Sequence, residues 1–65
     1  MEFKLDIIRA DRIVDDLAGT GEEGRARKAI INYRTVQTED SRKAALAAIS
    51  LLDENKQTEL RQRAN

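Results

Sequence analysis

Residues 44–52 read Ala-Ala-Leu-Ala-Ala-Ile-Ser-Leu-Leu, and Ser50 is the only polar side chain in the stretch. A helix on the surface of a small protein usually has one apolar stripe, whereas this stretch is apolar almost all the way round. Its four alanines are small enough to let neighbouring backbones approach closely. We therefore expect this segment to be enclosed on several sides and to be the centre of packing. The rest of the chain can cover only part of it, so the expectation concerns assembly.

The length of the chain limits its architecture. Its 65 residues predict one helical domain over residues 1–65. A chain this short buries only about 60% of its unfolded surface, so a core formed by one copy is marginal. Cysteine and histidine are both absent, which excludes disulfides and removes the usual zinc ligands. Oligomerisation is then the expected support, and the sequence predicts a homodimeric helical bundle.

Hydrophobic spacing predicts an all-α fold of three helices, over residues 5–18, 22–35 and 39–63. The third is long and rich in alanine and leucine. The chain has no proline to interrupt a helix, and its three glycines fall at positions 19, 21 and 24, between the first two helices. Thr20 and Glu23 have the spacing of a capping box for the second helix, and Thr38 is the expected N-cap of the third.

Two parts of the chain leave alternatives open. Residues 1–7 alternate apolar and polar side chains, which is also the period of a strand that would have to pair with another subunit. The stretch 53–59 has no apolar residue, so the third helix either continues with residues 53–65 frayed or projecting, or stops near Leu52. In the second case Asp53 would cap a fourth helix that carries Leu60. We favour the continuous helix.

No motif in the sequence specifies a chemistry. Residues 19–24 fit the pattern G-x-G-x-x-G, but they follow a predicted helix and place two glutamates where phosphates would bind. A serine nucleophile would have no histidine as its base. The adjacent Asp15 and Asp16 point about 100° apart on a helix and do not form a dyad. The sequence predicts no enzyme, no catalytic residue, no cofactor, no metal site and no small-molecule substrate.

Membrane and export signals are not expected. The longest apolar run, 44–52, is far below the roughly twenty residues that a membrane span requires. Glu2 and Asp6 interrupt the apolar residues near the N-terminus, unlike a signal peptide. We expect no membrane partner and a cytoplasmic location.

Charge is unevenly distributed in a chain of zero net charge. Residues 1–24 sum to −4 and residues 25–43 to +4. The candidate nucleic-acid contacts are the six cations Arg25, Arg27, Lys28, Arg34, Arg42 and Lys43. A sequence pI of 6.2 and only two aromatic side chains argue against this use. A ribbon–helix–helix dimer would also place Glu2, Lys4 and Asp6 in the major groove, where two carboxylates are unfavourable.

The favoured function is a non-enzymatic protein-binding regulator or adaptor that acts through helix packing, with itself and another protein as partners. The residues expected to pack against a partner or a second copy are Ala45, Leu46, Ala48, Ile49 and Leu52. A second contact surface is expected at Phe3, Leu5 and Ile8, which lie off the main stripe of the first helix. The alternative is a small nucleic-acid-binding regulator that uses the basic segment 25–43.

Overall fold

The computed structural model describes residues 3–65, and within them the chain is all-helical with no strand. The elements are α1 (Ile7–Ile13), the short 3-10 helix η1 (Val14–Asp16), α2 (Gly21–Val36), α3 (Glu39–Ser50) and α4 (Glu54–Ala64). The prediction of an all-α fold is confirmed. The prediction of three helices is wrong, because the long third helix is divided into α3 and α4.

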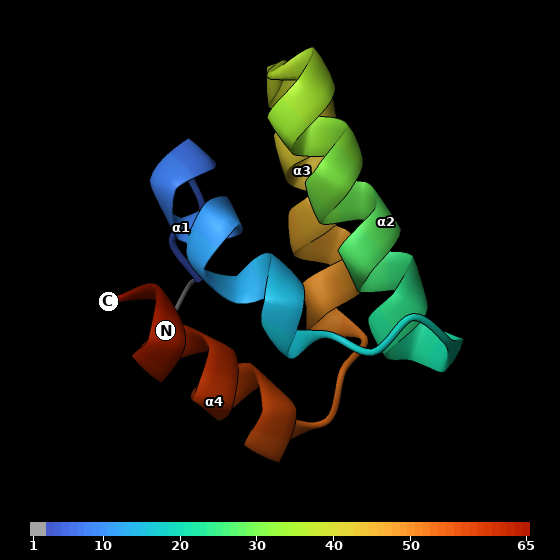
Figure 1. The fold of residues 1–65 in the computed structure, drawn as a ribbon, viewed down its shortest axis with the longest axis vertical. Coiled ribbons are helices and arrows are strands. Elements are labelled where there is room, and N and C mark those ends of the chain that lie inside the picture. The colour runs from blue at the N-terminus through green and yellow to red at the C-terminus, as the bar shows by residue number, and fades with distance from the viewer. Residues whose placement is uncertain (1–2) are drawn as a thin grey trace.

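The helices α2 and α3 form an antiparallel hairpin with a very short link (Figure 1). Gln37 ends α2 in the left-handed conformation, with φ of 55°, and its backbone N–H donates to the carbonyl of Tyr33. Thr38 then caps α3, because its hydroxyl accepts from the Ser41 N–H while the Ser41 hydroxyl accepts from the Thr38 N–H. The predicted N-cap at Thr38 is confirmed, and this reciprocal pair fixes where the chain reverses.

The first helix is shorter than the predicted range 5–18. Asp6 caps α1 by accepting from the Arg9 N–H at 2.8 Å, so residues before Ile7 are outside the helix. At the other end, the β-branched pair Ile13 and Val14 precedes two aspartates, which are unfavourable at the negative end of a helix. The chain tightens into η1 and becomes extended at Leu17.

The predicted continuous helix over 39–63 is wrong, and the alternative break near Leu52 is correct. Asp53 accepts from the Lys56 N–H at 2.8 Å and starts a new helix. The Gln57 side chain donates to the carbonyls of Ser50 and Leu52, which satisfies the end of α3. Continuing the helix would have placed seven polar residues in solvent, whereas the turn lets Leu60 reach the core.

Residues 53–65 pack against the rest of the chain and do not project. Leu60 and Ala64 are buried, and α4 lies beside α1 (Figure 1). The Arg12 guanidinium donates to the Ala64 carbonyl at 2.9 Å, so it holds the last turn of α4. Both α1 and α4 therefore cover the same side of the hairpin.

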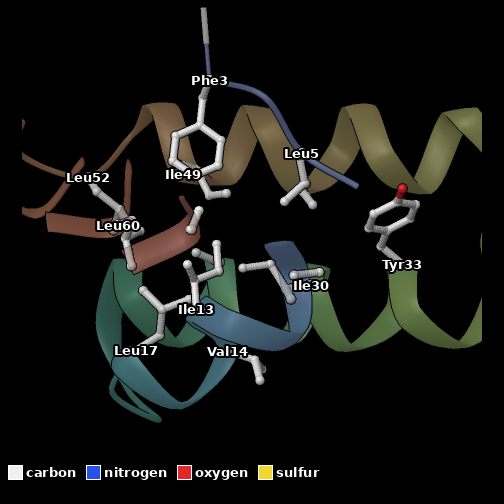
Figure 2. Close-up of a cluster of buried hydrophobic side chains, with 14 residues drawn as sticks. Phe3, Leu5, Ile13, Val14, Leu17, Ile30, Tyr33, Ile49, Leu52 and Leu60 are labelled. Carbon is white, nitrogen blue, oxygen red and sulfur yellow. The ribbon is translucent and has the colours of Figure 1, made fainter. Parts of the chain in front are cut away.

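The core draws one large, fully buried side chain from each of the four α-helices: Ile13, Ile30, Ile49 and Leu60. Figure 2 shows these residues gathered with Phe3 and Leu5 of the N-terminal segment. Phe3 and Leu5 point inward while Lys4 is exposed. This explains the strand-like alternation, because residues 3–5 are extended without belonging to a sheet; Met1 and Glu2 of that pattern lie outside the described residues.

Lys56 joins three elements at the base of the hairpin. Its ammonium donates to the Asp16 carbonyl at the end of η1 and to Glu59 within α4, and it lies 3.6 Å from Glu23 of α2. The hydrogen bond to Glu59 raises the pKa of Lys56, with the charges of Glu23 and Glu59 adding to it. A raised pKa means that this stabilisation is complete below the ordinary value of 10.5 and is lost as pH rises above it.

The glycine-rich segment is a tight entry into α2. Gly21 adopts a φ of 67°, which favours glycine. The expected capping box does not form: Thr20 is the N-cap without a side-chain hydrogen bond, and Glu23 instead accepts from the Ala18 N–H at 3.1 Å. Gly24 in the first turn of α2 lies against the backbone of Gly19, so the segment before α2 passes close to the start of that helix.

Replacing Gly24 by alanine should destabilise the fold, although alanine is the better helix former by about 1 kcal/mol. The added Cβ would lie 2.8 Å from the carbonyl carbon and oxygen of Gly19, so backbone must move. We expect a loss of about 1–3 kcal/mol in urea denaturation. Gly19→Ala is the matched control, since its Cβ would meet nothing within 4 Å, and it should change stability by less than about 0.5 kcal/mol. Equal stability of the two variants would contradict this account.

Candidate interaction surface

The five residues predicted to pack against a partner lie inside the chain's own structure. Ala45, Ile49 and Leu52 are in the core, and Leu46 and Ala48 are partly buried against it. They are occupied by α2, the N-terminal segment and the other helices, so they do not form an outer surface. The packing observed for these five side chains is within the chain.

The rest of the chain covers only part of residues 44–52, as expected from its length. One face of α3 is buried, and the exposed members of the stretch are Ala44, Ala47, Ser50 and Leu51. Ser50 satisfies its hydroxyl by donating to the Ala47 carbonyl at 2.6 Å, as is common for serine in a helix. Apolar side chains on the other face therefore remain in contact with solvent.

The residues of the predicted second contact surface are not brought together on one surface. Phe3 and Leu5 are buried in the core, whereas Ile8 on α1 is 64% exposed. Phe3 and Leu5 thus close the core of the chain, and Ile8 alone of the three is available to a partner.

The six cations of the segment 25–43 do not form one basic patch. Arg34 pairs with Asp11 of α1, and Arg42 pairs with Glu39 one turn earlier. Because α2 and α3 are antiparallel, the start of α3 with Arg42 and Lys43 lies at the opposite end of the hairpin from Arg25. Arg25 and Lys28 are exposed on α2, and Arg27 is partly buried.

A cleft of about 840 Å³ between the N-terminal segment, α3 and α4 was not predicted. Its lining includes the cations Lys4, Arg9, Arg42 and Arg61. The Arg61 guanidinium lies 6.0 Å from the centre of the Phe3 ring, and Arg9 pairs with Asp6. Sequence spacing gives little sign of this cleft, because its residues come from both ends of the chain. We refer to it as the N-terminal cleft; its arginines attach the N-terminal segment to the helices.

Two contacts establish which flank of α2 faces α1. Arg34 pairs with Asp11, and Ile31 lines a shallow hollow together with Ile7. The helix α3 packs along the other flank of α2 (Figure 1). On the side of α2 away from α1, helical geometry aligns a row of four residues: Arg25, Ala29, Asn32 and Val36. Three of them are exposed, and Ala29 is partly buried against the core.

The same reasoning applies to α3. Arg42 lines the N-terminal cleft with Phe3 and Arg61, so the N-terminal segment and α4 lie along that flank of α3. On the solvent side of α3, next to α2, lies a row of four exposed residues: Asp40, Ala44, Ala47 and Leu51. We call these two adjacent rows the hairpin face.

The hairpin face carries exposed apolar side chains in both rows, the polar Asn32 near its middle and a charge at each end. Val36 is 50% exposed and Leu51 is 63% exposed, and the alanines between them add no bulk. Arg25 lies at the end that carries Leu51, and Asp40 lies at the end that carries Val36. An exposed apolar surface bordered by opposite charges is typical of an interaction site.

The described residues give little support for other kinds of site. Residues 3–65 contain no group of three or more Asp or Glu side chains placed to hold a metal ion. In the same part of the chain, every helix is too short or too polar to span a bilayer. The G-x-G-x-x-G segment lies between η1 and α2 and in the first turn of α2, where Gly24 is used for close backbone packing.

Comparison with protein-family models, with curated proteins and with solved structures found no match to this chain. Function is therefore inferred from the surfaces of this fold.

Two carboxylates with altered acidity serve the structure. The backbone N–H of Arg9, and then the Arg9 charge, hold the pKa of Asp6 below 3.8. The hydrogen bond from the Arg42 side chain, and then its charge, hold the pKa of Glu39 below 4.5. A lowered pKa stabilises the folded state above the ordinary value, and this contribution is lost as pH falls through the folded-state value.

The free energy of unfolding should therefore fall as pH is lowered from about 5 to about 2. Asp6→Asn should reduce stability at pH 7 and weaken this acid dependence, because the group no longer titrates. The measurement is urea denaturation across that pH range, and Asp15→Asn, at an exposed position of η1, is the control. An acid dependence unchanged by Asp6→Asn would contradict the role of this cap.

Proposed function

We propose that this protein is a non-enzymatic protein-binding regulator or adaptor, and that it binds its partner through the hairpin face. The observation that carries the proposal is the exposure of Val36 and Leu51 on a helical surface that α1 and α4 leave uncovered. The row Ala44, Ala47 and Leu51 has the spacing by which one helix packs against another. Small side chains in that row allow the partner's backbone to approach.

The nucleic-acid alternative has weaker support. Phosphate binding needs cations that are close together and available, yet Arg34 and Arg42 are paired with Asp11 and Glu39. Arg25 and Lys28 remain exposed, but α2 carries Glu22 and Glu23 in its first turn. A protein is therefore the favoured partner. The cytoplasmic location stays a prediction.

Leu51→Asp should weaken partner binding without unfolding the chain, because a carboxylate would replace the most exposed large apolar side chain of the hairpin face. Ile8→Asp is the matched control: Ile8 is 64% exposed and Leu51 is 63% exposed, but Ile8 lies on α1. Tagged wild type and both variants are used for affinity capture from lysate after nuclease treatment, read by mass spectrometry. We expect a protein retained by wild type and Ile8→Asp, and reduced at least about tenfold with Leu51→Asp.

Loss of the captured protein with Ile8→Asp instead would assign binding to α1 and contradict the proposal. Capture that disappears on nuclease treatment and on replacement of Arg25 and Lys28 would favour the nucleic-acid alternative. Circular dichroism of each variant shows whether the helices still form, so that loss of binding in a folded variant is distinguished from unfolding.

A further inference from the structure

We infer that the occupant of the hairpin face is a second copy of this chain, packed face to face in an antiparallel, two-fold symmetric dimer. The inference rests on the proposed function, because it uses the same face and names the partner. It differs from the dimer expected from the sequence, whose contact residues lie in the core of the single chain. Three features of the face support a second copy: the spacing of its two rows, the position of its charges and the exposure of its large side chains.

The two rows have identical spacing. The α2 row lies at positions 25, 29, 32 and 36, and the α3 row at 40, 44, 47 and 51, so that each advances by four, three and four residues. This is the heptad spacing with which helices pack side by side over several turns. Because α2 and α3 are antiparallel, the two rows run in opposite directions over the same length, about 17 Å at 1.5 Å per residue.

The two ends of the face differ in a way that suits self-association. One end carries Arg25 and Leu51, and the other carries Val36 and Asp40. We place the two-fold axis in the plane of the interface and perpendicular to the helices. Each end of the face in one copy then packs against the opposite end of the face in the second copy. Both ends of the dimer then combine one arginine, one aspartate and two exposed apolar side chains, with the alanines between them.

Charge supports the antiparallel arrangement. If two copies met with like ends together, the two Arg25 side chains would lie at the same end of the interface, as would the two Asp40 side chains. In the antiparallel arrangement Arg25 instead lies diagonally across from the partner's Asp40, and this happens at both ends because a two-fold interface repeats each contact. Arg25 and Asp40 are both exposed in the single chain, which leaves them accessible for this pairing.

The interface is small, so the dimer is expected to be weak. A face of this length and two helices wide lies at the low end of protein interfaces, where complexes are transient. We expect a dissociation constant of about 10–100 μM, which sedimentation equilibrium measures at concentrations up to about 1 mM. The monomer has a mass of 7.4 kDa, so the dimer is easily distinguished.

Charge reversal tests the geometry. Arg25→Asp places carboxylates against each other at both ends of the dimer, and Asp40→Arg places guanidinium groups against each other. Each variant alone should raise the dissociation constant at least about tenfold. An equimolar mixture should restore association to within about threefold of wild type, because every end then has opposite charges again. Lys28→Asp, an exposed α2 position outside the face, is the control and should stay close to wild type.

Circular dichroism confirms that each variant folds before its mass is measured. A monomeric wild type at about 1 mM, or a mixture that associates no better than the single variants, would overturn the self-pairing. Dependence of capture on Leu51 would still support the proposed function in that case, so the two failures are distinguishable. Association weakened equally by Lys28→Asp would also overturn the assigned face.

Discussion

The antiparallel contact between α2 and α3 is the constraint on which the rest of the structure depends. Ala26 and Ala45 are fully buried, and such small side chains allow two helices to lie close together. The capping pair of Thr38 and Ser41 makes the link between the helices short, so their registers are fixed relative to each other. Every other element then packs against this hairpin or against the core beside it.

Coverage of the hairpin is limited by the length of the chain. The N-terminal segment, α1 and α4 cover one side, and they bring Ile13 and Leu60 to the same core as Ile30 and Ile49. The outer side keeps Val36 and Leu51 exposed. A small domain is marginally stable when it folds alone, so burying an apolar face in a second copy would add the support that disulfides and metals give other small proteins.

The sequence predicts helix identity well because helical spacing and caps are local. The 22–35 prediction differs from α2 by one residue at each end, and Thr38 was identified from its neighbours alone. The break at Asp53 depends on the free energy gained when Leu60 is buried in the core. Local hydrophobic spacing does not indicate this tertiary contribution. The partial exposure of residues 44–52 follows from the length of the chain, but apolar composition alone does not show which side stays uncovered. Lys56 lies in the stretch 53–59, which has no apolar residue to mark it in the sequence, yet it joins η1, α2 and α4.

The central claim is that this chain buries one face of α3 in its own core and leaves the other face available to a partner. The most direct measurement is thiol labelling of single cysteines, since the natural sequence has none. Ala45→Cys and Ala47→Cys place the same group two residues apart, one buried and one exposed. At micromolar concentration the account predicts labelling at least about a hundredfold slower at position 45 than at position 47. Equal labelling rates at the two positions in a folded protein would contradict it.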